Sequence, residues 1–510
     1  MIYRPFYLFK HLQILCLPYQ NDNNGNKIII LIEIVQFFLG NWRDMEPKEE
    51  SNFKTQVYTA FCVNLLAIAY GNSFGWISPA LDLLKTDATP LPSGPLSDYD
   101  IGIVGSASSF GGCLTSFFYG WIADKIGRKR ALISIAIPQV IAWFLIYFGQ
   151  NAYYLIAARF LQGFSGGGVY IVIPLFLTEI SEDRIRGRLG SLMVLSVNIG
   201  MIMAYVTGAY INYHWNCIIL LIVPLIFFIC VSVIHESPIY LMENGKSKHA
   251  ENALKFYRSG FSYKQAEMSN KLKNEYDNMT AYIKSAHLEG DSKLTLSDFT
   301  TRPARKSIIA AMALMVFEIF TGTYALLSYA SLVFDESGST LSPNDSAIIV
   351  GVIQVVGVYV STLLVDRAGR KLLMVTSAAC CTIGLSVFCV YDYMKVIGID
   401  VSDFNFIPLL SFAFVIFFAN LGLVSLPFLI ITELTPMKIK STVYSFALVF
   451  SWGLAFLTIY FLPTTINVMG IYGTMSIFAI CCLIGVIFNI FFIPETKNRS
   501  IEEIQEIMAR

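Results

Sequence analysis

The sequence predicts an all-α protein that crosses a membrane twelve times. Of its 510 residues, 55% are apolar and only 14% are charged, whereas soluble domains carry about 25% charged residues. A helix needs about 20 mostly apolar residues to cross ~30 Å of hydrocarbon, and twelve stretches meet this requirement. The predicted spans are residues 57–80, 101–123, 131–149, 153–177, 189–211, 216–234, 307–333, 346–365, 372–394, 406–432, 442–465 and 471–493.

A polar segment divides these spans into two sets of six. Residues 55–234 form an N-terminal six-helix bundle and residues 307–493 a C-terminal one, followed by a tail at 494–510. The segment between the bundles, 235–306, is rich in Lys, Glu and Asn. Apolar residues at helical spacing in 247–258 predict that this segment contains helices. A solvated linker without a fold of its own is the alternative.

The N-terminal extension, residues 1–54, is not predicted to contain a thirteenth span. Its apolar run at 28–40 is too short to cross a bilayer and contains Glu33. It also lacks the small-residue cleavage site of a signal peptide. Because Met45 offers a second start, the hypothesis is that residues 1–44 are a translation-start artefact or an unstructured extension.

Lys and Arg residues gather in the loops on one side of the predicted membrane. The opposite loops carry little beyond Lys85 and Lys395. Since cytoplasmic loops are enriched in basic residues, that side is predicted to be cytoplasmic, together with both termini, in a multi-pass protein of the plasma membrane. The basic loop residues are Lys125, Arg128, Lys129, Arg130, Arg184, Arg186, Arg188, Arg367, Arg370, Lys371, Lys438 and Lys440.

Two loops at corresponding positions of the bundles are near copies of each other. Residues 120–130, which follow span two, contain Asp-Lys-Ile-Gly-Arg-Lys, and residues 365–371, which follow span eight, contain Asp-Arg-Ala-Gly-Arg-Lys. A second pair closes spans four and ten, where Glu179 and Glu433 are each followed seven residues later by a basic residue. These correspondences predict a duplicated six-helix unit. Such repeats build alternating-access transporters, whose substrate site lies between the repeats.

The pattern Gly-x-x-x-Asp-x-x-Gly-Arg-Lys after span two resembles the signature of the major facilitator superfamily. Other motifs are similar to those of its sugar porter family, and the Ser-Pro-Ala-Leu at 78–81 looks most like insect facilitated trehalose transporters. Together the motifs extend the resemblance over residues 55–507. It implies the fold of that superfamily, with two pseudo-symmetric six-helix halves plus cytoplasmic helices. It also implies facilitative uniport of a sugar such as trehalose or a hexose. The motifs are Ala158-Arg159-Phe-Leu-Gln-Gly163, Glu236-Ser237-Pro238 and Pro494-Glu495-Thr496-Lys497.

Carboxylates at the predicted cytoplasmic helix ends are the candidates for a gating network. A carboxylate at the membrane edge is costly unless it is paired, and basic residues are predicted to lie within reach. The resemblance implies a salt-bridge latch between the halves that forms in the outward-open state and breaks in the inward-open state. Simple positive-inside anchoring is the alternative, and the two interpretations are compatible. The candidate network consists of Asp124, Arg128, Arg159, Glu179, Arg186, Asp366, Arg370, Glu433 and Lys440.

The residues expected to grip a sugar are largely replaced in this sequence. The resemblance implies a glutamine in span five, a Gln-Gln pair and an asparagine in span seven, a tryptophan in span ten and an amide in span eleven. Alignment through neighbouring landmarks places Val194, Glu318-Ile319, Tyr324, Phe428 and Ser451 at these positions. A conventional hexose pocket is therefore not expected.

Several polar and aromatic side chains remain as candidates for substrate contact. Phe428 is the candidate aromatic platform, with ordinary packing as the alternative. For Asn420, a hydrogen bond between helices is the alternative to ligand contact. The candidate substrate-binding residues are Asn72, Glu318, Tyr324, Asn420, Phe428, Ser451 and Trp452.

Glu318 is the most informative of these, because an ionisable group inside a span is expensive and usually functional. Three interpretations stay open: it pairs with a substrate ammonium, it titrates as a proton-coupling group, or it is protonated and hydrogen-bonded. Asn72 stands where the resemblance implies an aspartate in proton-coupled members, which favours a uniporter.

The alternatives to a facilitative sugar carrier are a proton-coupled symporter, a transporter of a non-sugar small polar solute, and a non-transporting sugar sensor. An enzyme is not expected, because the sequence contains no evident nucleophile–base pair, metal site or phosphate loop. We expect no cofactor and no nucleic-acid partner, since 36 basic residues balance 36 acidic ones. The expected partners are a small solute and the lipid bilayer, with the protein a monomer. Asn344 opens a glycosylation sequon in an outward loop.

Overall fold

The computed structural model describes residues 54–259, 269–289, 295–328, 342–497, 499 and 501–509. These residues are almost entirely helical, with no strand among them, which confirms the predicted all-α fold class. The hypothesis about residues 1–44 concerns a segment outside the described residues.

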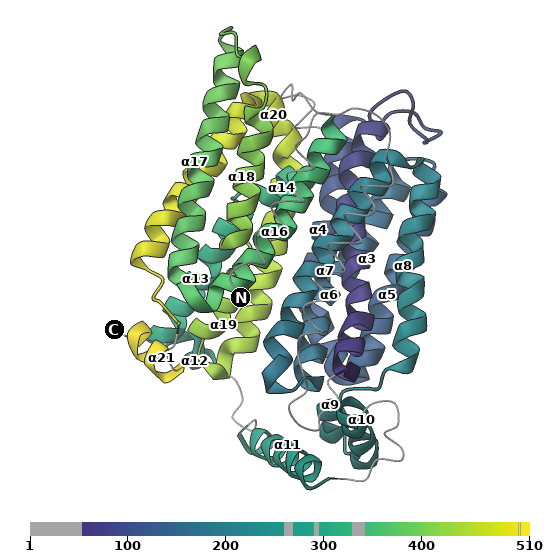
Figure 1. Cartoon of the computed structure of the whole chain (residues 1–510), viewed down its shortest axis with the longest axis vertical. Coiled ribbons are helices and arrows are strands. Elements are labelled where there is room, and N and C mark those ends of the chain that lie inside the picture. Colours follow the sequence, from purple (N-terminus) through teal and green to yellow (C-terminus); the bar gives the residue numbers. More distant parts are fainter. Residues whose placement is uncertain are drawn as a thin grey trace, which may run out of the picture. The chain divides into compact units, whose positions relative to one another are not determined.

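Six long helices form the first half of the protein (Figure 1). Each begins before its predicted span, as α4 does with a Ser97 capping box at its start. The helices are α3 (Lys54–Leu84), α4 (Asp98–Ile126), α5 (Arg128–Tyr147), α6 (Ala152–Ile180), α7 (Asp183–Tyr210) and α8 (Tyr213–Val233).

The second half contains the same predicted spans, but three regions depart from a simple helix. The seventh span is broken around Gly322, and the tenth is broken between Leu421 and Pro427. The last helix contains a non-helical residue, Gly470, with φ 73° and ψ 172°. The helices are α13 (Arg302–Ile319), α14 (Thr323–Ser328), α16 (Pro343–Ala368), α17 (Arg370–Val396), α18 (Ile407–Leu421), α19 (Pro427–Leu434) and α20 (Lys440–Phe491), with 3₁₀ turns at Ser402–Phe404 and Met437–Ile439.

Ten helices of the described chain are long and apolar enough to cross a membrane. The predicted number of twelve is reached when α18 and α19 together count as one span and the 52-residue α20 counts as two. An unbroken helix of 52 residues would be about 78 Å long, far more than one bilayer crossing needs. The break at Gly470 is thus what lets α20 supply two spans.

Short helices lie at one end of the bundles: α9 (Pro238–Glu243), α10 (Ser247–Ser259), α11 (Asn270–Glu289), α12 (Leu296–Thr300) and α21 (Ile501–Ala509). A buried arginine, Arg258, fastens α10 to its neighbours. Its guanidinium lies 2.6 Å from the carboxylate of Glu275 in α11 and donates a hydrogen bond of 2.8 Å to the carbonyl of Ile180. The segment between the bundles therefore contains helices packed against the first half.

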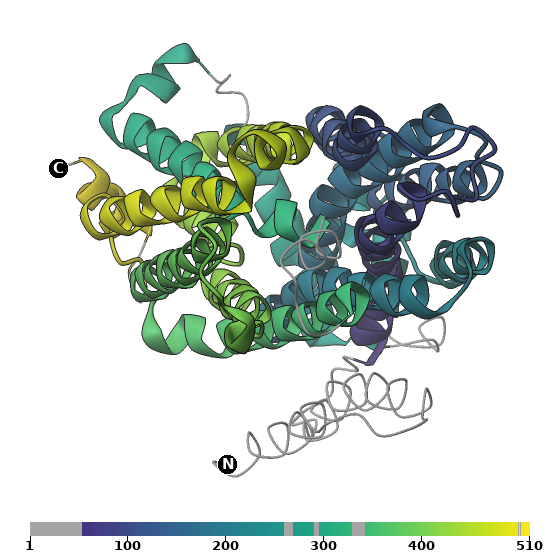
Figure 2. The ribbon, with the colours of Figure 1, turned by 90° about the horizontal axis from the view of Figure 1, so that it is seen from above.

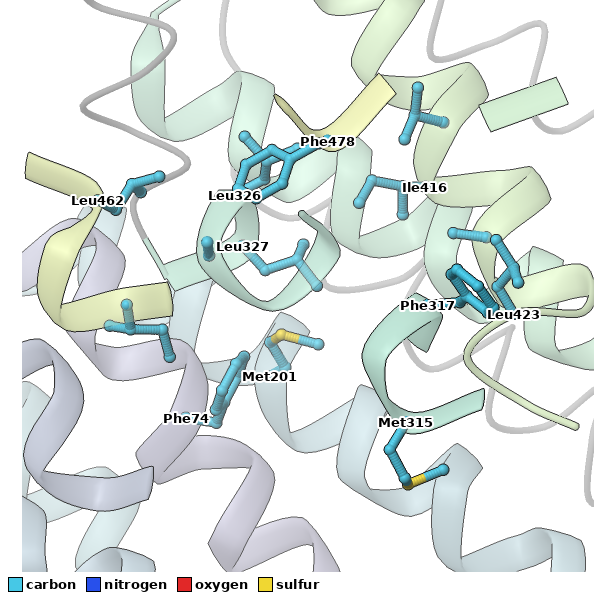
Figure 3. Close-up of a cluster of buried hydrophobic side chains, with 14 of the residues drawn as sticks. Phe74, Met201, Met315, Phe317, Leu326, Leu327, Ile416, Leu423, Leu462 and Phe478 are labelled. Atoms are coloured by element: carbon cyan, nitrogen blue, oxygen red, sulfur yellow. The ribbon is translucent and has the colours of Figure 1, made fainter. Parts of the chain in front are cut away.

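The two halves lie side by side and share one buried hydrophobic cluster (Figure 2). Helix α4 packs against α20, and α7 packs against α16. In the cluster, Phe74 and Met201 of the first half approach Leu326, Leu327 and Phe478 of the second (Figure 3). The region between the halves is the place to look for a functional site.

Candidate functional site

Three aromatic side chains from the two halves meet inside the protein. They are Tyr70 of α3, Tyr170 of α6 and Trp452 of α20. Their ring centroids lie 6.0–6.3 Å apart, and their planes are inclined to one another by 75–83°. Because α3 and α6 belong to the first half and α20 to the second, this ring trio joins the two halves.

Glycines make room for two of these rings. A Cβ atom at Gly166 would lie 2.3 Å from the Tyr70 ring, and a Cβ atom at Gly112 would lie 2.8 Å from the indole of Trp452. Any larger residue at either position would displace its ring. The ring trio therefore depends on small residues of α6 and α4 as well as on the aromatic residues themselves.

Glu318 lies in the last turn of α13, just before the break in the seventh span, and is only 1% exposed. Its Oε1 accepts a hydrogen bond of 3.1 Å from the hydroxyl of Tyr324. Its Oε2 has no hydrogen-bond partner among the described residues. Tyr170 and Tyr444 lie close enough to interact electrostatically with the carboxyl group. The structure thus brings Glu318 and Tyr324 together, as predicted for candidates of one site.

Tyr324 connects this carboxyl group to the ring trio. The centroid of its ring lies 6.1 Å from that of Phe74, and the two ring planes are nearly perpendicular. Its hydroxyl interacts electrostatically with Tyr70 and Tyr170. We call the resulting group the interfacial cluster. It consists of Tyr70, Phe74, Tyr170, Glu318, Tyr324, Tyr444 and Trp452.

Asn72 does not join the interfacial cluster, contrary to the expectation from the sequence. Tyr70 and Phe74 are four residues apart and share one face of α3, so Asn72, two residues from each, lies on the opposite face. Its backbone lies beside Gly200 of α7, and its side chain is fully buried, with neither amide atom hydrogen-bonded to a described residue.

The remaining candidates occupy varied positions around the cluster. Asn420 donates a hydrogen bond of 2.8 Å to the carbonyl of Ile416 in its own helix. Phe428 is half-buried, and its ring lies 5.6 Å from that of Tyr444. Ser451 is buried beside Trp452. Phe428 is therefore adjacent to the cluster, whereas the amide group of Asn420 is used within its helix.

Sequence reasoning missed four members of the cluster: Tyr70, Phe74, Tyr170 and Tyr444. No motif marks them, and single tyrosines in apolar helices are common packing residues. The only local signal is the four-residue spacing between Tyr70 and Phe74. Their common location depends on how α3, α6 and α20 pack.

A compact charge network holds the predicted cytoplasmic end of the first half. The guanidinium of Arg128, which is 4% exposed, lies 2.8 Å from Glu179 and 3.2 Å from Asp124. It also lies 4.0 Å from Glu243 of α9. The Asp124 side chain is 68% exposed and that of Glu179 only 8%, so Glu179 is the principal partner of the buried arginine.

The second half repeats this arrangement. Arg370 lies 3.3 Å from Glu433, at positions corresponding to Arg128 and Glu179. The other carboxylate oxygen of Glu433 accepts a hydrogen bond from the hydroxyl of Thr496.

The repeat extends to two glutamates, Glu236 and Glu495, which belong to separate sequence motifs. Glu236 accepts hydrogen bonds of 2.9 and 3.1 Å from the N–H of Lys129 at the start of α5. Glu495 accepts bonds of 2.9 and 3.1 Å from the N–H groups of Arg370 and Lys371 at the start of α17. Burial by itself raises the pKa of Glu495, but these and neighbouring backbone N–H groups outweigh it and hold the pKa below its usual value.

The glycines of the duplicated loop explain this geometry. Gly127 and Gly369 adopt φ values of 102° and 95°, a conformation that glycine accepts without steric cost. A Cβ atom at Gly127 would lie 2.4 Å from the carboxylate of Glu236, and one at Gly369 would lie 2.5 Å from that of Glu495. The glycine in each copy of the motif is thus required by backbone conformation and by the capping carboxylate.

Arg159 is placed differently from the sequence-based expectation. It lies twenty residues before Glu179 on α6, about 30 Å away along the helix axis. Its buried guanidinium donates hydrogen bonds to Gln162 Oε1 at 3.0 Å, to Ser108 Oγ at 3.1 Å and to the carbonyl of Ser73. It fastens α6 to α3 and α4 rather than joining the charge network at the helix ends.

Three candidates of the network remain. The side chains of two of them, Arg186 and Asp366, lie outside the described residues. Lys440 begins α20, and no ion pair of the described side chains includes it. The ion pairs around Arg128 and Arg370 each join groups within one half, so these pairs do not bridge the halves.

Two hydrogen bonds between the halves lie at the opposite, predicted outer end, and a weaker one of 3.6 Å joins the thiol of Cys113 in α4 to the carbonyl of Val449 in α20. The hydroxyl of Tyr205 in α7 donates a hydrogen bond of 2.8 Å to the carbonyl of Leu327 in α14. Near the end of α7, the Tyr210 hydroxyl donates to the carboxylate of Asp345 in α16. The outer ends of the two halves are therefore joined.

Two cavities lie away from the interfacial cluster. One of about 580 Å³ has an apolar lining of side chains from α4, α6 and α20, among them Phe110 and Phe456. The other, of about 350 Å³, lies near the outer ends of α3, α7 and α8 and is lined partly by Asn344. Asn344 is half-buried in the first turn of α16, and its glycosylation stays a prediction.

Comparison with known proteins places this geometry in context. A family model described as "Sugar (and other) transporter" matches residues 56–508. The facilitated trehalose transporter Tret1 of Polypedilum vanderplanki is 30% identical over 457 residues, covering 89% of this chain and 88% of the relative. Tret1 of Aedes aegypti is also 30% identical over 89% of this chain, which spans about half (55%) of that longer relative.

Solved structures show the same fold. The inward open xylose transporter XylE from E. coli superposes with a TM-score of 0.72 at 19% identity, covering 89% of this chain and 99% of the other. The major facilitator superfamily proton:xylose symporter XylE bound to 6-bromo-6-deoxy-D-glucose gives a TM-score of 0.66 at 18% identity, covering 88% and 99% of the two chains. This likeness confirms the fold expected from the duplicated motifs.

Proposed function

This chain belongs to the sugar transporter family, and we propose that it carries trehalose or a hexose down its concentration gradient across the plasma membrane. The trehalose transporters named above support this substrate class. As a multi-pass membrane protein of two similar halves, it would expose a site between them alternately to each side. The observation that carries the proposal is the interfacial cluster, which joins both halves.

The chemistry of the cluster supports a small polar solute. Aromatic faces suit the C–H surface of a sugar ring, and a few convergent polar groups fix its orientation. Glu318 and Tyr324 supply such groups next to the ring trio. Because these groups are shielded from water, a substrate hydroxyl that satisfies them gains specificity.

The charge networks around Arg128 and Arg370 support a role in the conformational cycle. Each network ties together helix ends within one half, so each half would move as a unit. Both termini would face the cytoplasm with these basic loops, and the protein would act as a monomer. A latch between the halves, as expected in the outward-open state, would form when the two networks approach each other.

Uptake into proteoliposomes tests the proposal. The purified protein should give saturable uptake of labelled trehalose or a hexose, accelerated by unlabelled sugar inside the vesicles, with no accumulation driven by a proton gradient. Trp452→Ala should reduce this uptake severely. The matched control is Trp121→Ala, whose indole is 62% exposed on α4 and should leave uptake unchanged. Sugar binding without flux would instead identify a sensor, and proton-driven accumulation would identify a symporter.

A further inference from the structure

Glu318 differs from the other buried carboxyl groups described above, because it has no cationic partner. Glu179 is paired with Arg128, and Glu433 with Arg370. Glu318 is more deeply buried than either, yet its described polar contact is one tyrosine hydroxyl, and no ion pair of the described residues includes it. An ionised carboxylate in such a place is strongly destabilising until a positive charge neutralises it.

The groups that face Glu318 from neighbouring helices are neutral. Tyr324 approaches from α14, Tyr170 from α6 and Tyr444 from α20. These elements supply hydroxyl groups and aromatic surfaces, and no described ion pair joins Glu318 to a Lys, Arg or His. Arg159 of α6 interacts electrostatically with Tyr70, but it donates its hydrogen bonds to other groups, among them Gln162, Ser108 and Ser73. When the carboxyl group of Glu318 is ionised, its counter-charge must therefore come from a bound molecule.

The ring trio of Tyr70, Tyr170 and Trp452 adds a second, independent feature that favours a cation. A positive charge is attracted to the face of an aromatic ring within about 6 Å of its centroid. The three rings lie 6.0–6.3 Å apart in nearly perpendicular planes. At this spacing the three rings touch edge to face, so a cation would lie against an uncovered face of the trio and not among the rings.

We propose that the interfacial cluster recognises a protonated amine carried by the transported solute, so that the preferred substrate class is an amine-bearing sugar. The free Oε2 of Glu318 accepts a hydrogen bond from the ammonium group, and the ring trio flanks it. A neutral sugar satisfies the hydrogen bond but leaves the carboxyl group without a counter-charge. This inference rests on the proposed function and narrows its substrate class.

Competition for sugar uptake tests the inference. The probes are glucosamine, glucose and N-acetylglucosamine; acetylation removes the positive charge of the amine while retaining the ring. In wild-type proteoliposomes at one fixed pH, glucosamine should inhibit tracer uptake at a concentration about tenfold lower than either neutral sugar, as expected for a charge-assisted hydrogen bond. Equal inhibition by the three sugars would overturn the inference and leave the proposed sugar transport standing.

A substitution assigns the preference to the carboxyl group. In Glu318→Gln, the advantage of glucosamine over N-acetylglucosamine should fall to less than twofold. The matched control is Asp392→Asn, since Asp392 is another largely buried carboxyl group, which caps the N–H of Tyr472 at 2.9 Å; here the preference should persist. A preference that survives Glu318→Gln would overturn the inference. The wild-type comparison does not depend on the folding of either variant.

Binding in detergent separates this inference from the proposed function. If no sugar is transported at all, the proposed function fails, but selective thermal stabilisation of the wild-type protein by glucosamine would still support the amine subsite. If glucosamine stabilises the protein no more than N-acetylglucosamine does, the subsite assignment fails.

Discussion

Removing the hydroxyl group of Tyr205 should open the outer end of the protein. This hydroxyl donates a hydrogen bond of 2.8 Å to the carbonyl of Leu327, and both groups are shielded from water when the outer ends are joined. In an outward-open state the halves separate, and water replaces the lost bond. Tyr205→Phe therefore destabilises the outer-closed state more than the outer-open one.

The expected magnitude follows from the burial of the acceptor. Losing one hydrogen bond and leaving a buried carbonyl unsatisfied costs about 1–2 kcal/mol. This corresponds to a change of roughly 5- to 30-fold in the ratio of outer-closed to outer-open molecules. A change of that size is large enough to alter a measured distance distribution.

Pulsed EPR measures the effect directly. Spin labels at Asp87 and Ile397, which are exposed at the outer ends of the two halves, should show a larger long-distance population in Tyr205→Phe. The matched control is Tyr119→Phe, which removes a hydrogen bond of 3.2 Å to Ser134 within the first half. If both variants give the wild-type distribution, or if both shift it equally, the bond between Tyr205 and Leu327 does not control opening of the outer end.

Three further predictions concern the helix contacts and charge networks. Glu495→Gln should weaken the pH dependence of thermal stability. Because the pKa of Glu495 is lowered in the folded protein, its contribution to stability is full above its usual pKa and is lost as the pH falls through the lowered value. If the melting temperature of the variant falls with acid as steeply as that of the wild type, this prediction is wrong. Gly163→Ala should lower the free energy of unfolding by about 1–3 kcal/mol, because the added Cβ would lie 1.7 Å from a backbone carbonyl of α4. The control Gly453→Ala adds a Cβ in open space and should not lower it; equal melting temperatures of the two variants would refute the packing argument. Glu179→Gln should reduce transport and shift the population inward-facing more than Asp124→Asn does, since only Glu179 is buried against its arginine; unchanged rates at normal surface expression would argue against a latch.

Some features of the site could be predicted from the sequence, because local physical constraints determine the residue type at their positions. Glu318 stands out in an apolar helix because ionisable groups are rare there. The duplicated loop stands out because Gly127 and Gly369 need positive φ values and a neighbouring carboxylate excludes a Cβ atom. By contrast, Asn72 was assigned to the site from its resemblance to a family position, and the helical repeat of α3 turns it away from Tyr70 and Phe74.

The sequence by itself determined that this protein has apolar spans in two similar halves, because spans, basic loops and repeats are local properties of composition and order. Only the tertiary structure decided which side chains share a site. Tyr70, Tyr170 and Trp452 are far apart in the chain and become neighbours because glycines let α4 and α6 approach the rings. Likewise, Arg159 bonds to the helices beside it rather than to the acids at the far end of its own helix. Contacts of this kind depend on how helices pack, which no single segment of the sequence specifies.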